Sequence, residues 1–324
     1  MDKLSLIRQP IEEEMNRYKS LFNEAFSHQN DLLGEMLEYV RGKHGKMMRP
    51  MLVILSAKEF GPVNDNVLHS AVTLELLHTA SLSHDDVIDE SNERRGAASV
   101  NALFGNKASI LTGDYLLSRS LHEAALTGNV EIVDVVAKLG GTLAEGEIRQ
   151  LDNLQRATAS EESYFEIIQH KTAALFEACG RLGALAAEAP AEKVEICAKL
   201  GELIGICFQI RDDIFDYYDN SIIGKPTGSD MREGKLTLPV IFALKNNSNA
   251  EIDALAKKVL ECKADEESIN RLVEFTKTAG GIAYANSVMD KYAEKAYKLL
   301  EKFSNEDVRK ALQHYVDFTI QRDR

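Results

Sequence analysis

ELLHTASLSHDDVIDESNERRG, residues 75–96, is the stretch that best indicates how this chain folds. Asp85 and Asp89 are four positions apart, so on a helix they lie on one face, one turn from each other. His78, seven positions before Asp85, lies two turns back on that face, and Asp86 flanks it. The spacing therefore predicts a helix that gathers carboxylates along one side.

The three carboxylates of this motif repel one another. At an effective dielectric of about 20, each contact near 4 Å costs roughly 4 kcal/mol, so a cation is expected among them. Oxygen ligands without a neighbouring Cys suit Mg²⁺, which commonly takes one or two protein carboxylates and completes its shell with water and substrate phosphate. Arg94 and Arg95 follow closely and suit a phosphate. A lone motif of this kind is more often a solvated helix face.

A second copy of the pattern favours the metal site. FQIRDDIFDY, residues 208–217, repeats the spacing with Asp212, Asp213 and Asp216 in a more apolar frame. Two such triads facing each other are predicted to form a clamp that holds a diphosphate through several metal ions.

Composition bounds the fold and the function. By length alone, 324 residues suggest two domains, but six prolines and no low-complexity tract leave no evident linker. No run of alternating β-branched residues indicates a strand, so we expect a single all-α domain over residues 1–324. The net charge of −13 argues against nucleic-acid binding.

Location is also predicted from the sequence. The N-terminus has charges throughout and no apolar core of a secretory signal, and no stretch is apolar enough to span a membrane. The four cysteines form no CxxC pair, and we expect them to be reduced core residues. These features predict a cytoplasmic protein without a transmembrane segment, touching a membrane only in passing when product is released.

Several local signals mark helix ends and cationic side chains. Gly42 is expected to end an N-terminal helix, Asn64 or Asp65 to cap the helix of the first motif, and Ser160 to begin another. The helix from Ala191 is expected to run through the second motif and stop near Asn220. Gly113 is expected to permit close packing of its helix, and Glu145 and Glu147 are expected to be solvated. Lys46 and Arg49 lie beside Pro50 at an expected helix start, and Lys171 and Thr172 lie in an apolar stretch where a surface role is less expected.

Residues 222–239, IIGKPTGSDMREGKLTLP, form the only long stretch rich in Gly, Pro and polar residues. It carries Lys225, Arg232 and Lys235. A loop of this kind beside a metal site is predicted to be a flexible lid for phosphates.

Taken together, these segments closely resemble the trans-polyprenyl diphosphate synthases, and among them the long-chain, octaprenyl-type enzymes. The matching segments are GKMMRP (45–50), HTASLSHDDVID (78–89), ERRG (93–96), GDYLL (113–117), EGEIRQL (145–151), HKTAALF (170–176), FQIRDDIFDY (208–217) and GKPTGSDMREGKLTLP (224–239). The departures from the family pattern are His44, Met47 and Ala98.

The resemblance implies an isoprenoid-synthase fold, with helices around a deep central cavity, in a homodimer. It implies Mg²⁺ ligands at Asp85, Asp89 and Asp212, with Asp86, Asp213 and Asp216 as supporting carboxylates. Contacts to the allylic diphosphate are implied for Arg94, Lys171, Thr172, Gln209 and Lys225. Contacts to isopentenyl diphosphate are implied for Lys46, Arg49, His78 and Arg95.

The implied reaction condenses isopentenyl diphosphate repeatedly onto an allylic diphosphate. Ala80 and Ser81, the fifth and fourth residues before Asp85, bear on its product. In short-chain members of the family one or both positions are aromatic, so two small residues predict a long-chain product, heptaprenyl or longer, of the kind attached to quinones. The alternative is that they are helix-packing residues with no bearing on the product.

Other functions are weighed against this one. A short-chain farnesyl or geranylgeranyl diphosphate synthase and a catalytic subunit of a heteromeric synthase stay open. A terpene cyclase would normally replace the second Asp triad by Asn/Asp, Ser/Thr and Glu, and a ferritin-like di-iron protein needs two Glu-x-x-His motifs where only Glu75 to His78 supplies one. A non-catalytic subunit would be expected to lack some of the aspartates, and all are present.

Overall fold

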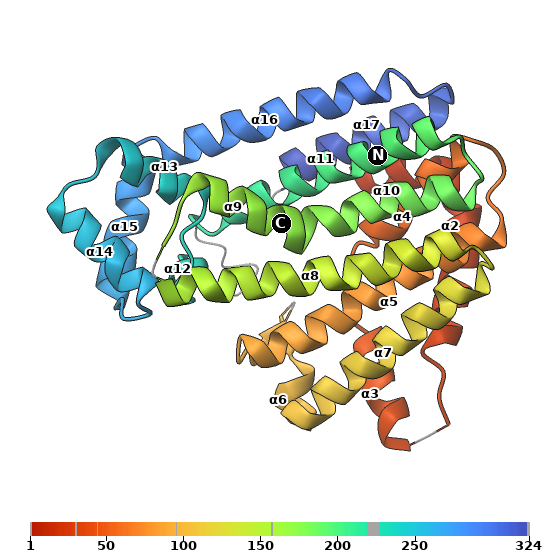
Figure 1. Ribbon diagram of the computed structural model, residues 1–324, viewed down its shortest axis with the longest axis horizontal. Helices are drawn as coiled ribbons and strands as arrows, with labels where there is room; N and C mark the ends of the chain where they lie inside the picture. The colour runs from red at the N-terminus through yellow and green to blue at the C-terminus, as the bar shows by residue number, and fades with distance from the viewer. Residues whose placement is uncertain are drawn as a thin grey trace. The chain divides into compact units, whose positions relative to one another are not determined.

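The computed structural model describes residues 2–29, 31–43, 45–94, 96–156, 158–218 and 227–322, and these are almost entirely helical (Figure 1). The predicted all-α class is confirmed. In chain order the elements are α1 (Lys3–Arg8), η1 (Gln9–Ile11), α2 (Glu12–Ala25), α3 (Asp31–Arg41), α4 (Met48–Lys58), α5 (Asp65–Ile88), β1 (Glu93–Arg94), β2 (Ala97–Ala98), α6 (Val100–Phe104), α7 (Asn106–Leu126), α8 (Val130–Arg156), α9 (Glu161–Ile168), η2 (Gln169–Ala173), α10 (Ala174–Ala186), α11 (Ala191–Phe215), α12 (Ser229–Arg232), α13 (Leu238–Asn247), α14 (Ala250–Leu260), α15 (Glu266–Thr278), α16 (Gly281–Leu300) and α17 (Glu306–Gln321).

The chain divides into two compact units, each assembled from separate stretches of sequence. The first comprises Met1–Gly141, Leu175–Glu202 and Lys298–Tyr315, and the second Thr142–Ala174, Leu203–Tyr297 and Val316–Arg324. The single domain over residues 1–324, the central cavity and the facing of the two motifs stay predictions. None of the helices in the described ranges is long and apolar enough to cross a lipid bilayer.

In the first unit, α5 lies alongside α7 (Figure 1). The α5 sequence is apolar on most sides, which suits a helix surrounded by neighbours. Its start is the predicted one, because the Asn64 side chain accepts a hydrogen bond from Val67 N at 3.0 Å. Gly113 of α7 is needed for the close approach: a Cβ there would lie 2.3 Å from His84 Nε2.

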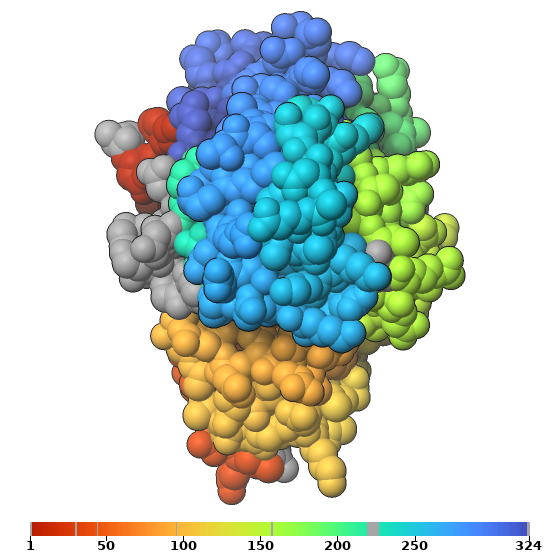
Figure 2. Space-filling view, turned by 90° about the vertical axis from the view of Figure 1, so that its left-hand side faces the viewer, coloured from red at the N-terminus to blue at the C-terminus, as the bar shows by residue number. Residues whose placement is uncertain are grey.

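In the second unit, Ser160 caps α9 as predicted, accepting from Ser163 N at 3.1 Å. Aromatic stacking joins further helices, since the rings of Phe242 in α13 and Tyr284 in α16 are 4.0 Å apart. The Tyr284 hydroxyl also donates to Glu161 in α9 at 2.6 Å. Figure 2 shows the outer faces of α14 and α15 side by side.

Three local expectations were wrong. The helix of the second motif ends at Phe215, before Asn220, which lies outside the described residues. Glu93 and Arg94 pair with Ala97 and Ala98 in a two-residue hairpin that no sequence pattern indicated. Cys262 is exposed and lies in a turn, whereas burial raises the pKa of the Cys197 and Cys207 thiols to about 12.

Helix contacts that require glycine provide a test of packing in the first unit. A Cβ on Gly180 of α10 would lie 2.0 Å from the backbone oxygen of Cys197 in α11. We expect Gly180→Ala to lower the free energy of unfolding by about 3 kcal/mol because the two backbones must separate. Gly141→Ala, in α8 with no atom within 4 Å of the new Cβ, is the control. It should instead raise stability by about 0.5–1 kcal/mol. Urea unfolding measures both, and equal effects would contradict this packing.

Candidate functional site

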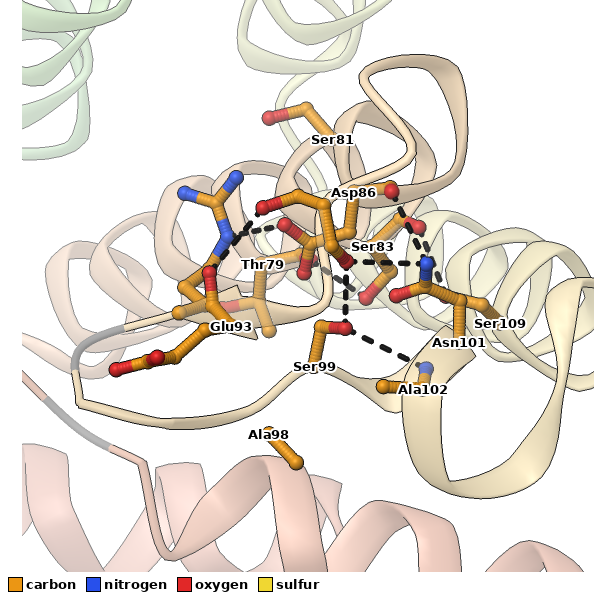
Figure 3. A network of polar contacts seen from close by, with 12 residues as sticks. Thr79, Ser81, Ser83, Asp86, Glu93, Ala98, Ser99, Asn101, Ala102 and Ser109 are labelled. Atoms are coloured by element: carbon orange, nitrogen blue, oxygen red, sulfur yellow. Dashed lines mark hydrogen bonds and ion pairs between the residues drawn. The ribbon is translucent and has the colours of Figure 1, made fainter. Parts of the chain in front are cut away.

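The first aspartate motif ends α5 and is held by one buried carboxylate. Asp86 is 3% exposed and accepts a hydrogen bond from Arg94 Nε at 2.5 Å. The hairpin brings Arg94 back toward α5, and Asn101 Nδ2 donates to the backbone oxygens of Asp86 and Ser91, both at 3.1 Å (Figure 3). Asp86 and Arg94 therefore fix the shape of this turn.

The other two aspartates of this motif are more open. Asp85 is half-buried near the end of α5, and Asp89 is exposed and caps the helix with its backbone N–H 2.8 Å from Asp85 O. Asp89 thus lies just past the helix rather than within it, but still one turn from Asp85.

A cavity of about 60 Å³ in the first unit lies beside this motif. His78, Asp86 and Arg94 line it, together with Tyr39 and Lys43. Of the residues predicted to hold isopentenyl diphosphate, His78 is the described one that lines this cavity.

Two further residues of that predicted group are described, and neither lines this cavity. Lys46 is exposed just before α4. The guanidinium carbon of Arg49 lies 5.1 Å from the ring centre of Phe176, which orients it by a cation–π contact. Arg95 lies outside the described residues.

The second motif, in the second unit, gives its three aspartates three different partners. Asp213, 4% exposed, accepts hydrogen bonds from the Tyr164 hydroxyl and from Gln209 Nε2. Asp216 lies past the end of α11 and accepts from Ser229 N at 2.8 Å and from Asp230 N at 3.1 Å, in the first turn of α12. Asp212 forms an ion pair with Arg322.

Burial dominates the protonation of Asp213. The pKa of this carboxyl is raised to about 7: burial raises it most, the hydrogen bonds from Tyr164 and Gln209 lower it, and the negative charges of Asp212 and Asp216 raise it. Burial also raises the pKa of Tyr164, which keeps its hydroxyl a donor to this carboxylate.

A cavity of about 210 Å³ opens beside the second motif. Four residues predicted to contact diphosphate line it, namely Lys171, Thr172, Gln209 and Lys235, as does Asp213. Thr172 Oγ1 donates to Gln209 Oε1 at 2.7 Å, which ties η2 to α11. The second unit thus gathers cationic and amide donors around one cavity. Lys225 lies outside the described residues.

Lys171 is positioned by the EGEIRQL segment of α8. It lies in a π-helical turn, a rare irregularity that is common at functional sites. Its Nζ contacts Glu147 at 2.5 Å and Gln150 Oε1 at 3.0 Å. Gly146 permits this approach, because a Cβ there would lie 2.9 Å from Lys171 Cγ. The expectation that Glu147 is solvated was wrong.

The described part of the predicted lid, from residue 227 onward, is anchored to the second unit. Arg232 pairs with Glu266 through two hydrogen bonds of 2.8 and 2.6 Å, and Lys235 contacts Glu233 at 2.5 Å. Burial, with the charges of Asp216 and Asp213, raises the pKa of Asp230. These contacts bind the described part of the segment to its own unit, and the flexible lid stays a prediction.

The carboxylate donors fit a hard divalent cation. Asp85 and Asp212 are half-buried and Asp89 is exposed, whereas Asp86 and Asp213 are buried, and all offer oxygen. Within the described ranges no three His, Cys, Asp or Glu side chains are arranged to hold a metal ion by themselves.

Comparison with known proteins assigns the family. The polyprenyl synthetase model matches residues 30–276. The chain belongs to the polyprenyl synthetase family. It is therefore a prenyltransferase, as predicted. The octaprenyl diphosphate synthase of Haemophilus influenzae is 35% identical over 282 residues, which cover 87% of this chain and 85% of that protein. The heptaprenyl diphosphate synthase component 2 of Geobacillus stearothermophilus is 35% identical, covering 97% and 95%.

Solved structures confirm the isoprenoid-synthase fold. The decaprenyl diphosphate synthase of Rhodobacter capsulatus superposes with a TM-score of 0.92 at 34% identity, covering 99% of both chains. The geranylgeranyl pyrophosphate synthase of Bacteroides thetaiotaomicron gives 0.88 at 46% identity, covering 99% and 100%. A polyprenyl synthase of Caulobacter crescentus, with a TM-score of 0.92 at 30% identity over 98% of both chains, was solved with calcium and isoprenyl diphosphate. A protein of this fold thus binds calcium together with isoprenyl diphosphate.

The first motif yields a test that separates a structural from an exposed aspartate. Asp86→Ala leaves Arg94 without its buried carboxylate, and because Arg94 is about a third exposed we expect a loss of about 2 kcal/mol in unfolding free energy. Asp89→Ala, at an exposed position of the same motif, should change it by less than about 0.5 kcal/mol. Urea unfolding without divalent metal measures both. A pair of equally stable variants would show that Asp86 does not hold the turn.

Proposed function

We propose that the chain condenses isopentenyl diphosphate repeatedly onto an allylic diphosphate, with Mg²⁺, to give a long-chain all-trans polyprenyl diphosphate. The cavity that gathers Lys171, Thr172 and Gln209 beside the second aspartate motif carries this proposal. Anionic diphosphate needs local cations and donors in a protein whose net charge is −13, and this cavity supplies them.

Lys171, Thr172 and Gln209 of the second unit are assigned to the allylic diphosphate. Asp212, with Asp85 and Asp89 of the first unit, is assigned to metal binding because these are more exposed than Asp86 and Asp213, and because both oxygens of Asp216 accept backbone N–H groups of α12. A bound divalent ion supplies Lewis-acid stabilisation of charge on the departing diphosphate. Lys171 and Thr172 stabilise the same charge by donating to its oxygens.

The supporting residues act through those that touch the substrate. Glu147 and Gln150 hold the Lys171 ammonium at the cavity, and Gln209 links Thr172 to the buried Asp213. Apolar side chains such as Ile168 and Leu236 also line the cavity and limit access of water to an allylic carbocation.

His78, Lys46, Arg49 and Arg95 are assigned to isopentenyl diphosphate. His78 lines the cavity of the first unit, and Arg49 is held over Phe176, which supports a role in orienting a diphosphate. This substrate attacks the carbocation through its double bond. Proton loss then restores an alkene, and the released diphosphate is the base we propose, since no His or Glu is evidently placed for it.

The long-chain assignment draws on relatives and on two small residues. Octaprenyl, nonaprenyl and decaprenyl synthases are among the relatives, although the 46% identical structure is that of a geranylgeranyl pyrophosphate synthase. Ala80 is 2% exposed and Ser81 is half-buried, with its hydroxyl donating to His78 O at 2.9 Å. Figure 3 shows Ser81 directed away from the Asp86 network.

Product analysis tests the function. The purified protein, given Mg²⁺, isopentenyl diphosphate and several allylic primers, is expected to release heptaprenyl or longer diphosphates resolved by chromatography. If no product is longer than geranylgeranyl diphosphate, the protein is instead a short-chain farnesyl or geranylgeranyl diphosphate synthase. The same assay tests the alternative of a catalytic subunit of a heteromeric synthase, which the 35% identical heptaprenyl diphosphate synthase component 2 brings to mind. A catalytic subunit of this kind would release no product from any primer until its partner subunit is added.

A single substitution tests the chain-length gate. Ser81→Phe should shorten the dominant product to farnesyl or geranylgeranyl length while the first condensation keeps its rate, because the aspartates are untouched. Ala80→Phe is a poorer probe, since this position is buried and a larger residue there would cost about 1–3 kcal/mol by overpacking. An unchanged product distribution in Ser81→Phe would remove Ser81 from the gate.

Metal binding is tested by removing its proposed ligands. Asp85→Ala and Asp212→Ala should each lower kcat at least about 10²-fold, because each loses an interaction with charge that develops in the transition state. Asp134→Ala, which removes an exposed carboxylate paired with Lys138 in α8, is the control and should retain kcat. Steady-state kinetics at saturating Mg²⁺ decide the matter. Near-normal turnover in either motif variant would refute its role.

We also propose a homodimer built on α7. Ile110, Leu117 and Leu121 are exposed and lie on one face of this helix, at spacings of seven and four. Leu103 in α6 and Leu126 at the end of α7 are also exposed. Apolar side chains gathered along one helix typically mark an interface.

A double substitution tests this dimer. Leu117→Glu with Leu121→Glu should convert a dimer into a monomer, because two charges would have to be buried. Leu32→Glu changes an equally apolar, exposed residue on α3 and should leave the dimer intact. Sedimentation velocity measures the mass of each. A double variant that sediments as a dimer would place the interface elsewhere.

A further inference from the structure

Arg322, the residue after α17, has a buried guanidinium at the second aspartate motif. Its side chain is 9% exposed and forms an ion pair with Asp212, which is 43% exposed. The same group donates from Nη2 to Phe208 O at 3.0 Å. Its central carbon lies 3.8 Å from the ring centre of Phe208 and 5.6 Å from that of Phe215. A surface arginine usually keeps its guanidinium in water, whereas the guanidinium of Arg322 is held by an ion pair, a hydrogen bond and two aromatic rings.

The backbone of this segment is fastened to the same helix. Arg211 Nε and Nη2 both donate to Arg322 O, at 3.0 and 2.9 Å. The Arg211 guanidinium itself lies over Phe215, 4.7 Å from the ring centre. Both the side chain and the carbonyl of Arg322 are therefore held by α11, beside the motif.

The partners of the three aspartates differ in charge. Asp213 is bound by the neutral donors of Tyr164 and Gln209, and Asp216 by two backbone N–H groups. Asp212 is bound by a cation, Arg322. A guanidinium stays charged at all working pH values, so Arg322 offsets the charge of the Asp212 carboxylate at any pH as long as the two remain in contact.

We infer that Arg322 stands in for the metal ion at Asp212 in the metal-free enzyme, and that a divalent cation must displace it. The inference rests on the proposed role of Asp212 as a metal ligand. The two cations compete because they would repel each other strongly if both contacted one carboxylate. Arg322 is thus a positioning residue that keeps Asp212 in place before metal binds and leaves when metal and diphosphate arrive.

If Arg322 and the metal ion compete for Asp212, replacing Arg322 by an uncharged residue should make the metal bind more tightly. Binding of Mn²⁺ to the metal-free full-length protein, without diphosphate, is followed by electron paramagnetic resonance of the free ion. Arg322→Gln should lower the Kd at least about threefold, the effect of a modest ion pair. Arg271→Gln is the control, because it makes the same charge change at an exposed arginine paired with Glu251. Its Kd should stay at the wild-type value.

A second pair of variants keeps the test independent of folding and of the proposed function. Arg322→Lys retains the charge and should keep the wild-type Kd. Adding Asp212→Asn to Arg322→Gln should abolish the gain. If Asp212→Asn alone leaves both Mn²⁺ binding and turnover unchanged, the proposed metal role of Asp212 fails. If it weakens Mn²⁺ binding but Arg322→Gln shows no gain, only the stand-in role is overturned.

Hydrogen exchange reports displacement without any activity measurement. In the wild-type protein, Mn²⁺ with inorganic diphosphate should raise amide exchange over residues 316–322, since the contacts of Arg322 to Asp212 and Phe208 are lost. Exchange over α15, which holds Arg271, should not rise. Unchanged or slower exchange over residues 316–322 would overturn the inference.

Discussion

Repulsion among the carboxylates of Asp212, Asp213 and Asp216 is the constraint on which the second unit depends. Three charges on two successive turns in an apolar frame persist only when each has its own partner. Asp213 is bound by Tyr164 of α9, and Asp216 by the start of α12. Asp212 takes Arg322 after α17. One cluster of like charges thereby holds three distant segments against α11.

The first motif follows the same rule with different parts. In both motifs the second aspartate of the adjacent pair is buried and satisfied by the protein, while the first is more exposed. Neighbouring residues of a helix point about 100° apart, so one carboxylate can face inward while the other faces outward. We therefore assign Asp86 and Asp213 to the scaffold, and we propose Asp85 and Asp212 as the carboxylates that a metal ion would meet.

Cationic side chains of the site are also held before substrate arrives. Lys171 is bound by Glu147, Arg94 by Asp86 and Arg322 by Asp212. In the proposed function, holding Lys171 and Arg94 in place would lower the entropy lost when a diphosphate binds, whereas Arg322 would have to leave Asp212. Displacing any of these cations would leave its carboxylate without that partner, so the proposed binding would be coupled to rearrangement.

Local patterns in the sequence were sufficient for the helical class, the caps at Asn64 and Ser160, and the two aspartate motifs, because helix periodicity and capping depend on residues only a few positions apart. The π turn at Lys171 and its partner Glu147, 24 positions earlier, had no such local signal. Tyr164 meets Asp213 across 49 positions, and Arg322 meets Asp212 across 110. Such pairings arise only when whole helices pack, because a buried charge accepts whatever donor the tertiary structure brings to it.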